Sequence, residues 1–303
     1  MAGGAGAEPM GRRHPILRAL FFLALGVFGL LVLVAGVTLF AGDDWLTFGK
    51  TVGVVDIRGV IQDGTDTIET LERFRTQEST VAVVLRIDSP GGAVAPSQEV
   101  YDAVWRVREQ KPVIASLGNV AASGGYYIAS AANLIVADPG TVTGSIGAIL
   151  SVPYYAPLAE KIGVSEETVK SGRYKDTGHP LRHLSVDERA LLQGMVDDVL
   201  GQFVEAVARG RGMPSDRVRS LADGRVYSGT QALAAGLVDR MGGLASATRI
   251  AWEEAHQTGE PRVHRVRARH LPWLLQLLDE TLLNGPHATY GGLFFLYRGS
   301  VPQ

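Results

Sequence analysis

The N-terminal part of the chain carries one long apolar run. Residues 19–42 contain no charged side chain, with Arg18 immediately before them and Asp43 immediately after. A helix of ~20 residues is long enough to cross a ~30 Å hydrocarbon core, so this run predicts a transmembrane anchor in the lipid bilayer. Arginines gather before the run and aspartates after it. By the positive-inside rule, residues 1–18 would be cytoplasmic and the rest of the chain after the run would lie outside the cell (inner) membrane.

A cleaved signal peptide is the alternative interpretation of the same run. The apolar core of a signal peptide usually has ~7–15 residues and precedes a small-residue cleavage site. The run in this chain is longer, and no clean A-x-A site lies near its end. We therefore expect an uncleaved, single-pass anchor.

Beyond residue 50 the hydrophobic pattern switches between two periods. Short apolar segments bounded by polar residues predict strands, and apolar positions at spacings of three and four predict helices. In chain order the pattern predicts strand Val52–Ile57, helix Thr67–Phe74, strand Val81–Ile87, helix Pro96–Arg108 and strand Val113–Leu117. Strands that alternate with helices favour an α/β domain with a largely parallel sheet, in which functional residues follow the strand ends.

A longer helix is predicted over Val186–Arg209. Ser185 and Glu188 form a capping-box pattern at its start. Its apolar positions recur at helical spacing and are interpreted as core residues: Leu192, Met195, Val199, Phe203 and Val207.

Composition narrows the classes of function. The 303 residues are 46% hydrophobic and 20% charged with a formal net charge of -2, so nothing calls for a polyanionic partner and nucleic acid is not expected. Cysteine is absent, which excludes thiolate metal sites and a cysteine nucleophile. Zincin, P-loop and dinucleotide-binding motifs are also missing. We therefore expect neither a metal nor a cofactor.

Three polar or glycine-rich segments follow apolar strands and are predicted to be loops: Asp88–Gly92, Gly118–Tyr127 and Ser171–Asp176. In the second, Ser123 follows two alanines and precedes two glycines. This pattern suits a strand-to-helix turn with an exposed, nucleophilic hydroxyl. Serine is also a favoured helix N-cap, and on the local pattern alone that ordinary structural role is the commoner one.

A serine nucleophile needs a base to accept its proton. No histidine lies between Ser123 and Lys175, and His179 and His183 occur in a glycine- and proline-containing stretch typical of an exposed loop. A lysine amine can act as the base if burial favours its neutral form. Taken alone, however, Lys175 is more typical of a solvated surface lysine.

Together, these segments resemble the signal peptide peptidase A family, a membrane-bound relative of the Clp proteases and crotonases. The resemblance spans about Val52–Trp252 and includes Thr143–Gly147, Gly224–Gly229 and Gly236–Asp239. It implies an α/β peptidase domain of repeated ββα units over residues 52–256, behind one N-terminal transmembrane helix. It also implies peptide substrates, chiefly remnant signal peptides, and a homo-oligomer that shields its active sites.

The resemblance further implies a serine endopeptidase with a Ser/Lys dyad. Ser123 would be the nucleophile and Lys175 its general base. The supporting residues would be Gly91 or Gly92 together with Gly124 for the oxyanion, and Ser145 for orienting the lysine amine. On local grounds alone, the glycine pair is as typical of a plain turn and Ser145 of a turn serine.

Two other functions stay open. A non-proteolytic crotonase-type acyl-thioester enzyme can also use paired backbone amides at an oxyanion hole. A catalytically silent membrane scaffold would keep the anchor and the fold. Neither function requires Ser123 or Lys175.

The C-terminal extension, residues 257–303, has a pattern of its own. Arg262–His270 alternates basic and apolar residues, and Leu271–Leu283 has amphipathic helical character. An edge strand followed by a packing helix is the simpler interpretation. Contact with a membrane surface or another subunit is the alternative.

Overall fold

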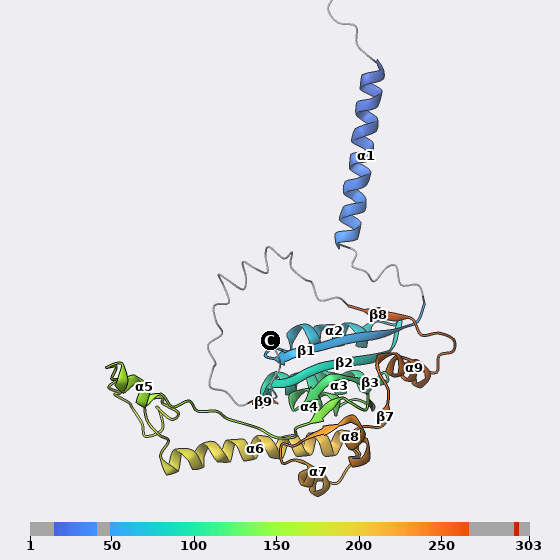
Figure 1. The fold of residues 1–303 in the computed structure, drawn as a ribbon. Coiled ribbons are helices and arrows are strands. Elements are labelled where there is room, and N and C mark those ends of the chain that lie inside the picture. Colours follow the sequence, from blue (N-terminus) through green and yellow to red (C-terminus); the bar gives the residue numbers. More distant parts are fainter. Residues whose placement is uncertain (1–14, 41–48, 267–293, 297–303) are drawn as a thin grey trace, which may run out of the picture. The chain divides into compact units, whose positions relative to one another are not determined.

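The computed structural model describes residues 15–40, 49–266 and 294–296 and divides into two units, Met1–Gly49 and Lys50–Gln303. The first unit holds helix α1 (Pro15–Phe40), which covers most of the apolar run (Figure 1). In the part of the chain that the structure describes, no helix reaches the length and apolarity required of a membrane span. Most of the tail 1–18 and the end of the predicted anchor lie outside the described residues.

The second unit contains the remaining elements. Its strands are β1 (Thr51–Ile61), β2 (Thr80–Ala93), β3 (Val113–Ala122), β4 (Leu134–Ala137), β5 (Val142–Gly144), β6 (Val226–Ser228), β7 (Arg240–Met241), β8 (Val263–Arg265) and β9 (Phe294–Leu296). Its helices are α2 (Thr65–Thr76), α3 (Val94–Arg108), α4 (Gly124–Ala129), α5 (Ala156–Lys161), α6 (Val186–Arg211), α7 (Ser215–Leu221), α8 (Gly229–Ala235) and α9 (Leu244–Glu254).

A mainly parallel sheet organises this unit, as the alternating pattern predicts. The strand order is β6-β5-β3-β2-β1-β8, with β4 pairing with β3 and β7, and β9 pairing with β2. Antiparallel pairing occurs between β5 and β6 and between β2 and β9. Successive parallel strands must be joined by crossovers, and α2 and α3 make the crossovers from β1 to β2 and from β2 to β3.

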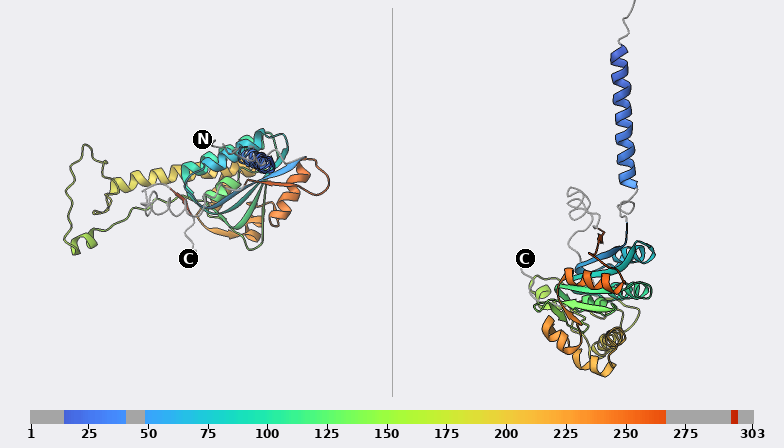
Figure 2. Two further views of the ribbon diagram at one scale, coloured as in Figure 1. Left: turned by 90° about the horizontal axis from the view of Figure 1, so that it is seen from above. Right: turned by 90° about the vertical axis from the view of Figure 1, so that its right-hand side faces the viewer.

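Helices cover both faces of the sheet (Figure 2). One face packs against α2, α3, α4 and the C-terminal part of α6, burying Phe74 and Phe203 among others. The other face packs against α9, which buries Ala251 and Trp252 on Val54 and its neighbours. Burial on both faces explains why the central strands are almost continuously apolar rather than alternating.

Two of the predicted loops are largely strand. β2 continues past Ile87 to Ala93, and β3 continues past Leu117 to Ala122. Gly91 and Gly92 pair with the end of β1, so the ladder runs through a serine-proline-glycine sequence of low intrinsic strand preference. Partner strands on the sheet override the local preference at this point.

The long helix is confirmed, but the prediction that its whole apolar stripe is core is wrong. The capping box of Ser185 and Glu188 is present at the start of α6. Phe203 and Val207 are buried, whereas Met195 is 49% exposed. The N-terminal half of α6 extends beyond the sheet and carries α5 and its flanking segments at its far end (Figures 1 and 2). Helical spacing identifies an apolar face but does not say which turns have a partner.

The C-terminal extension begins with the predicted edge strand. β8 pairs with β1 at the end of the sheet order, and Arg265 binds Asp56 of β1 through two hydrogen bonds of 2.5 Å. The predicted helix Leu271–Leu283 lies outside the described residues.

Candidate active site

Ser123 occupies a sharp turn between β3 and α4, as predicted. Its backbone has φ 52° and ψ -117°, a conformation that L-residues rarely adopt. Two backbone hydrogen bonds of 2.8 Å fix the turn: the Ser123 N–H donates to the Gly144 carbonyl, and the Tyr127 N–H donates to the Ser123 carbonyl. The side chain makes no capping hydrogen bond.

This geometry argues against an ordinary N-cap. An N-cap serine has an extended backbone and accepts a hydrogen bond from the following turn, and Ser123 has neither feature. A strained conformation of this kind costs about 1–3 kcal/mol and is concentrated at functional sites. The predicted exposed hydroxyl is not found, because Ser123 is only 1% exposed.

Gly91, Gly92 and Gly124, the glycines predicted to bind the oxyanion, lie close together beside this turn. A Cβ atom on Gly124 would lie 3.2 Å from the Gly92 nitrogen and 3.3 Å from the Gly91 Cα, so the three glycines are in close contact. The Gly91 N–H already donates to the Ser89 hydroxyl at 3.1 Å. Gly124 begins α4, where an N–H has no acceptor within the helix. The amides of Gly92 and Gly124 are therefore better suited to an oxyanion than that of Gly91.

Glycine is required here for space. A Cβ atom on Gly92 would lie 2.0 Å from the Ile61 carbonyl oxygen, and one on Gly124 would lie 2.7 Å from the Ser97 hydroxyl oxygen. Ser97 is fully buried and donates to the Ala93 carbonyl. Ser89 and Ser97 are not among the site residues that the sequence predicts, although Ser89 stands two residues before the glycine pair.

Ser145 lies on the other side of the turn at Ser123, because β5 pairs with β3 on the edge opposite to β2. Its φ of 50° is also positive, and its N–H donates to the Arg225 carbonyl at 2.9 Å. The preceding residue, Gly144, pairs with Ala122 and accepts the Ser123 N–H. Thr143 ties the two strands further, since its hydroxyl donates to the Ala121 carbonyl at 2.7 Å. Ser123 and Ser145 thus directly follow the ends of two neighbouring strands, β3 and β5, that are joined by hydrogen bonds.

Lys175 is not brought to this cluster within one chain. It is exposed and lies in the segment that joins α5 to α6. The residue that follows it, Asp176, is linked through Arg182 to Glu188 in the first turn of α6. This end of α6 lies beyond the sheet (Figures 1 and 2). The backbone N–H of Lys175 closes a turn on the Gly172 carbonyl. Among the described residues, no acidic side chain pairs with its ammonium group.

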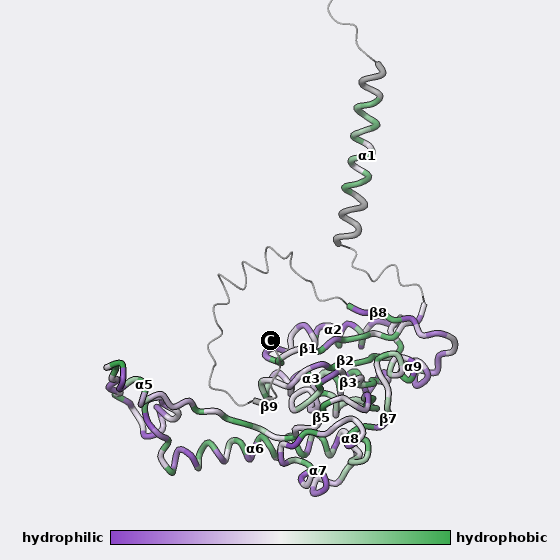
Figure 3. Tube along the Cα trace, in the orientation of Figure 1, coloured by the Kyte–Doolittle hydropathy of each residue, from purple (hydrophilic) through white to green (hydrophobic). Residues whose placement is uncertain are grey.

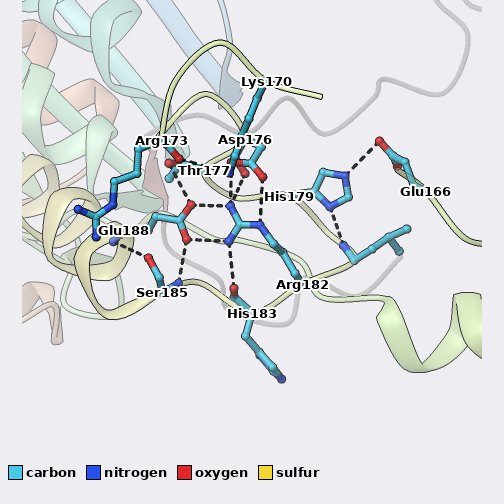
Figure 4. A network of polar contacts seen from close by, with 11 residues as sticks. Glu166, Lys170, Arg173, Asp176, Thr177, His179, Arg182, His183, Ser185 and Glu188 are labelled. Carbon is cyan, nitrogen blue, oxygen red and sulfur yellow. Dashed lines mark hydrogen bonds and ion pairs between the residues drawn. The ribbon is translucent and has the colours of Figure 1, made fainter. Parts of the chain in front are cut away.

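The segment around Lys175 is held by a polar network (Figure 4). Asp176 accepts hydrogen bonds from Lys170 at 2.6 Å and from Arg182 at 3.2 Å. Lys170 and Arg182 together lower the pKa of Asp176 to about 2. Arg182 also binds both oxygens of Glu188 and thereby holds the pKa of that carboxyl well below its usual range.

The two loop histidines have structural partners. His179 accepts a hydrogen bond from the Leu181 N–H and lies 3.1 Å from a carboxylate oxygen of Glu166. His183 is exposed and stacks on Tyr154 with ring centroids 3.8 Å apart.

Comparison with known proteins decides the family. The model for peptidase family S49 matches residues 106–258, and the Clp protease model matches residues 54–136. This chain belongs to peptidase family S49. As a member of that family it is a serine peptidase, and the resemblance to signal peptide peptidase A is confirmed. The family S49 match includes Ser123 and Lys175.

Relatives of this S49 peptidase include bacterial and plant proteins. A Synechocystis protein described as a protease is 45% identical over 195 residues, covering 64% of this chain and 70% of the relative. The chloroplastic serine protease SPPA of Arabidopsis thaliana is 36% identical over 253 residues, covering 77% and 37%. An Enterococcus faecium protein described as a signal peptide peptidase is 39% identical over 173 residues, covering 57% and 50%. The chain thus spans half or less of the latter two.

Proposed function

We propose that this S49 peptidase is a membrane-anchored serine endopeptidase that hydrolyses remnant signal peptides and other extended, membrane-near peptides. Ser123 is the nucleophile and Lys175 the general base. The observation that carries the proposal is the strained turn at Ser123, which lies beside Gly91 and Gly92 at the end of β2. A segment of the same chain, β9, already lies extended along this end of β2.

The end of β2 that carries Gly91 and Gly92 has one edge on the same side as Ser123. Strand β9 runs antiparallel to the end of β2 and pairs with Gly91, Gly92 and Ala93. The other side of Gly91 and Gly92 is taken by the end of β1. A strand has only two edges, so β9 lies on the side of β3, whose last residue immediately precedes Ser123, and it contacts α4.

A substrate peptide would bind where β9 lies. Peptide recognition by strand addition uses main-chain hydrogen bonds to an exposed sheet edge and side-chain pockets for selectivity. The segment that occupies the edge, Phe294–Leu296, is aromatic and aliphatic, as is the core of a signal peptide. A substrate that adds to this edge of β2 would take the place of β9 beside Gly91 and Gly92.

In each half-reaction of the proposed chemistry, Lys175 accepts one proton and then gives it up. Lys175 takes the proton of Ser123 as its oxygen attacks the peptide carbonyl, and the amides of Gly92 and Gly124 bind the resulting oxyanion. The lysine gives this proton to the leaving amine. It then takes a proton from the water molecule that attacks the acyl group and returns it to the Ser123 oxygen as the acyl group leaves, while the hydroxyl of Ser145 orients the amine.

The dyad would form between copies of the chain. Lys175 lies at the remote end of α6, away from Ser123 of its own chain, so a neighbouring copy is the natural source of the base. The arm, which we define as α5, the segments that flank it and the start of α6, exposes apolar side chains, including Ile162 at 66% and Val186 at 85%. Figure 3 shows hydrophobic positions along it. Such exposed apolar surface is typical of a surface that binds another protein, here a second copy in a homo-oligomer.

Helix α1 would anchor the enzyme. Its described side chains, from Leu20 to Val32, are apolar and exposed. With the basic flank inside, an epitope at residue 2 should be protected from protease added to cells with a permeabilised outer envelope, and an epitope at residue 303 should be digested. The opposite protection pattern would reverse the proposed orientation.

Removing the C-terminal residues from 294 onward should raise activity. If the tail occupies the edge more than nine-tenths of the time, its loss should lower the KM for an apolar fluorogenic peptide by about tenfold or more. A synthetic peptide with the sequence of residues 291–300 should then inhibit the shortened enzyme competitively. The control peptide carries Asp in place of Phe294, Phe295 and Leu296. An unchanged KM together with no inhibition would contradict peptide binding at this edge.

A further inference from the structure

Arg182 joins the loop that carries Lys175 to the first turn of α6. Its Nε donates to Asp176 Oδ2 at 3.2 Å, and Nη2 donates to the Asp176 carbonyl at 3.0 Å. Its Nη1 and Nη2 also bind the two carboxylate oxygens of Glu188 at 2.7 and 2.5 Å. One guanidinium therefore spans the residue next to Lys175 and a residue of the helix (Figure 4).

Glu188 is itself fixed. It is the acidic member of the capping box, accepting the Ser185 N–H at 2.8 Å and donating its own N–H to the Ser185 hydroxyl. Its side chain is only 4% exposed, so this end of the network is anchored on a regular helix. The contacts make a continuous connection from α6 through Arg182 to the position immediately after Lys175.

The charges of this segment are arranged in pairs. Arg173 pairs with Asp187, His179 contacts Glu166, and Asp176 is bound by both Lys170 and Arg182. Asp176 directly follows Lys175 in the sequence, and its carboxylate oxygens are bound by these two cations. A free carboxylate beside a lysine favours the charged ammonium, which cannot act as a base.

We propose that Arg182 is a positioning residue for the catalytic base: it fixes the Lys175 loop on α6 and keeps Asp176 from pairing with the lysine. The inference rests on the proposed role of Lys175. Arginine suits this task better than lysine, because its planar fork binds two carboxylates at once and stays charged.

The test compares Arg182→Gln with wild type on a fluorogenic peptide from pH 5 to 10. Without the guanidinium, kcat should fall about tenfold or more while KM changes little. The rise of activity with pH should also move to higher pH, since Asp176 Oδ2 loses its arginine partner while Lys170 keeps Oδ1, and the released oxygen favours the protonated amine. Adding Asp176→Asn to Arg182→Gln should move that rise back, a response that a purely structural role would not give. Arg182→Lys should recover only part of kcat.

Arg189→Gln is the matched control, because Arg189 also lies at the start of α6 and the structure gives its side chain no contact with Asp176 or Glu188. It should behave as wild type. A wild-type kcat and pH profile in Arg182→Gln, with Lys175→Arg inactive, would overturn the positioning role and leave the proposed function standing. If Lys175→Arg keeps its activity, the proposed function itself fails. Should Arg182→Gln fold poorly, Arg182→Lys alone decides, since one ammonium cannot bind Asp176 and Glu188 together as the guanidinium fork does, and a wild-type kcat and pH profile in this variant would overturn the positioning role.

Discussion

Ser123→Ala is expected to abolish peptide hydrolysis, lowering kcat by roughly 10⁴- to 10⁶-fold, as removal of a nucleophile does in other serine proteases. The chain should stay folded, because the change deletes one oxygen and the turn is held by backbone hydrogen bonds to Gly144 and Tyr127. The measurement is turnover of a fluorogenic peptide, with circular dichroism as the check on folding.

Labelling by a serine-directed fluorophosphonate adds a readout independent of the peptide chosen. Wild type should be labelled and Ser123→Ala should not, with Ser130→Ala as a control at another buried serine. Labelling that persists in Ser123→Ala would place the nucleophile elsewhere. No labelling of the wild-type enzyme, even after removal of the C-terminal tail, would favour an acyl-thioester enzyme or a silent scaffold.

Lys175→Arg is expected to be as inactive as Ser123→Ala despite keeping its charge. A guanidinium stays protonated in proteins and cannot accept the serine proton. The wild-type enzyme should gain activity as pH rises and the lysine amine loses its proton. An arginine variant with a near-normal rate and an unchanged pH profile would exclude Lys175 as the base.

Mixing the two inactive variants tests whether the dyad forms between copies. In a random one-to-one mixed oligomer, about a quarter of the sites receive an intact serine from one copy and an intact lysine from another. Activity should therefore return on co-expression to about that fraction of wild type. If co-expressed variants form mixed oligomers but stay inactive, the dyad must form within a single chain.

The sheet and its crossover helices could be predicted from the sequence because hydrophobic period is a local property. The predicted strand that begins at Val52 and the helix that ends at Arg108 both match the structure closely. The far ends of the strands could not be predicted. Gly91 and Gly92 belong to β2 only because β1 and β9 pair with them, and those partners are remote in sequence.

The candidate site divides in the same way. The turn at Ser123 follows from its neighbours, since a serine between a strand and two glycines has few conformations that satisfy the following helix. The separation of Lys175 from Ser123 depends on α6 extending past the sheet, and no local pattern reports that. Met195 has the spacing of a core residue and yet is exposed, because no element of the described chain packs on that turn.

The half of α6 that extends beyond the sheet sets both the distance and the direction of the segment that it carries. Each residue of an α-helix advances the chain by 1.5 Å along the helix axis and rotates it by about 100° around that axis. A single residue inserted between Met195 and Phe203 would rotate the Lys175 segment to a different side of the helix while hardly lengthening it. Four inserted residues would nearly restore the direction but carry the lysine about 6 Å farther out. In the proposed oligomer, the phase of this helix, more than its length, would therefore set which neighbouring copy the arm can reach.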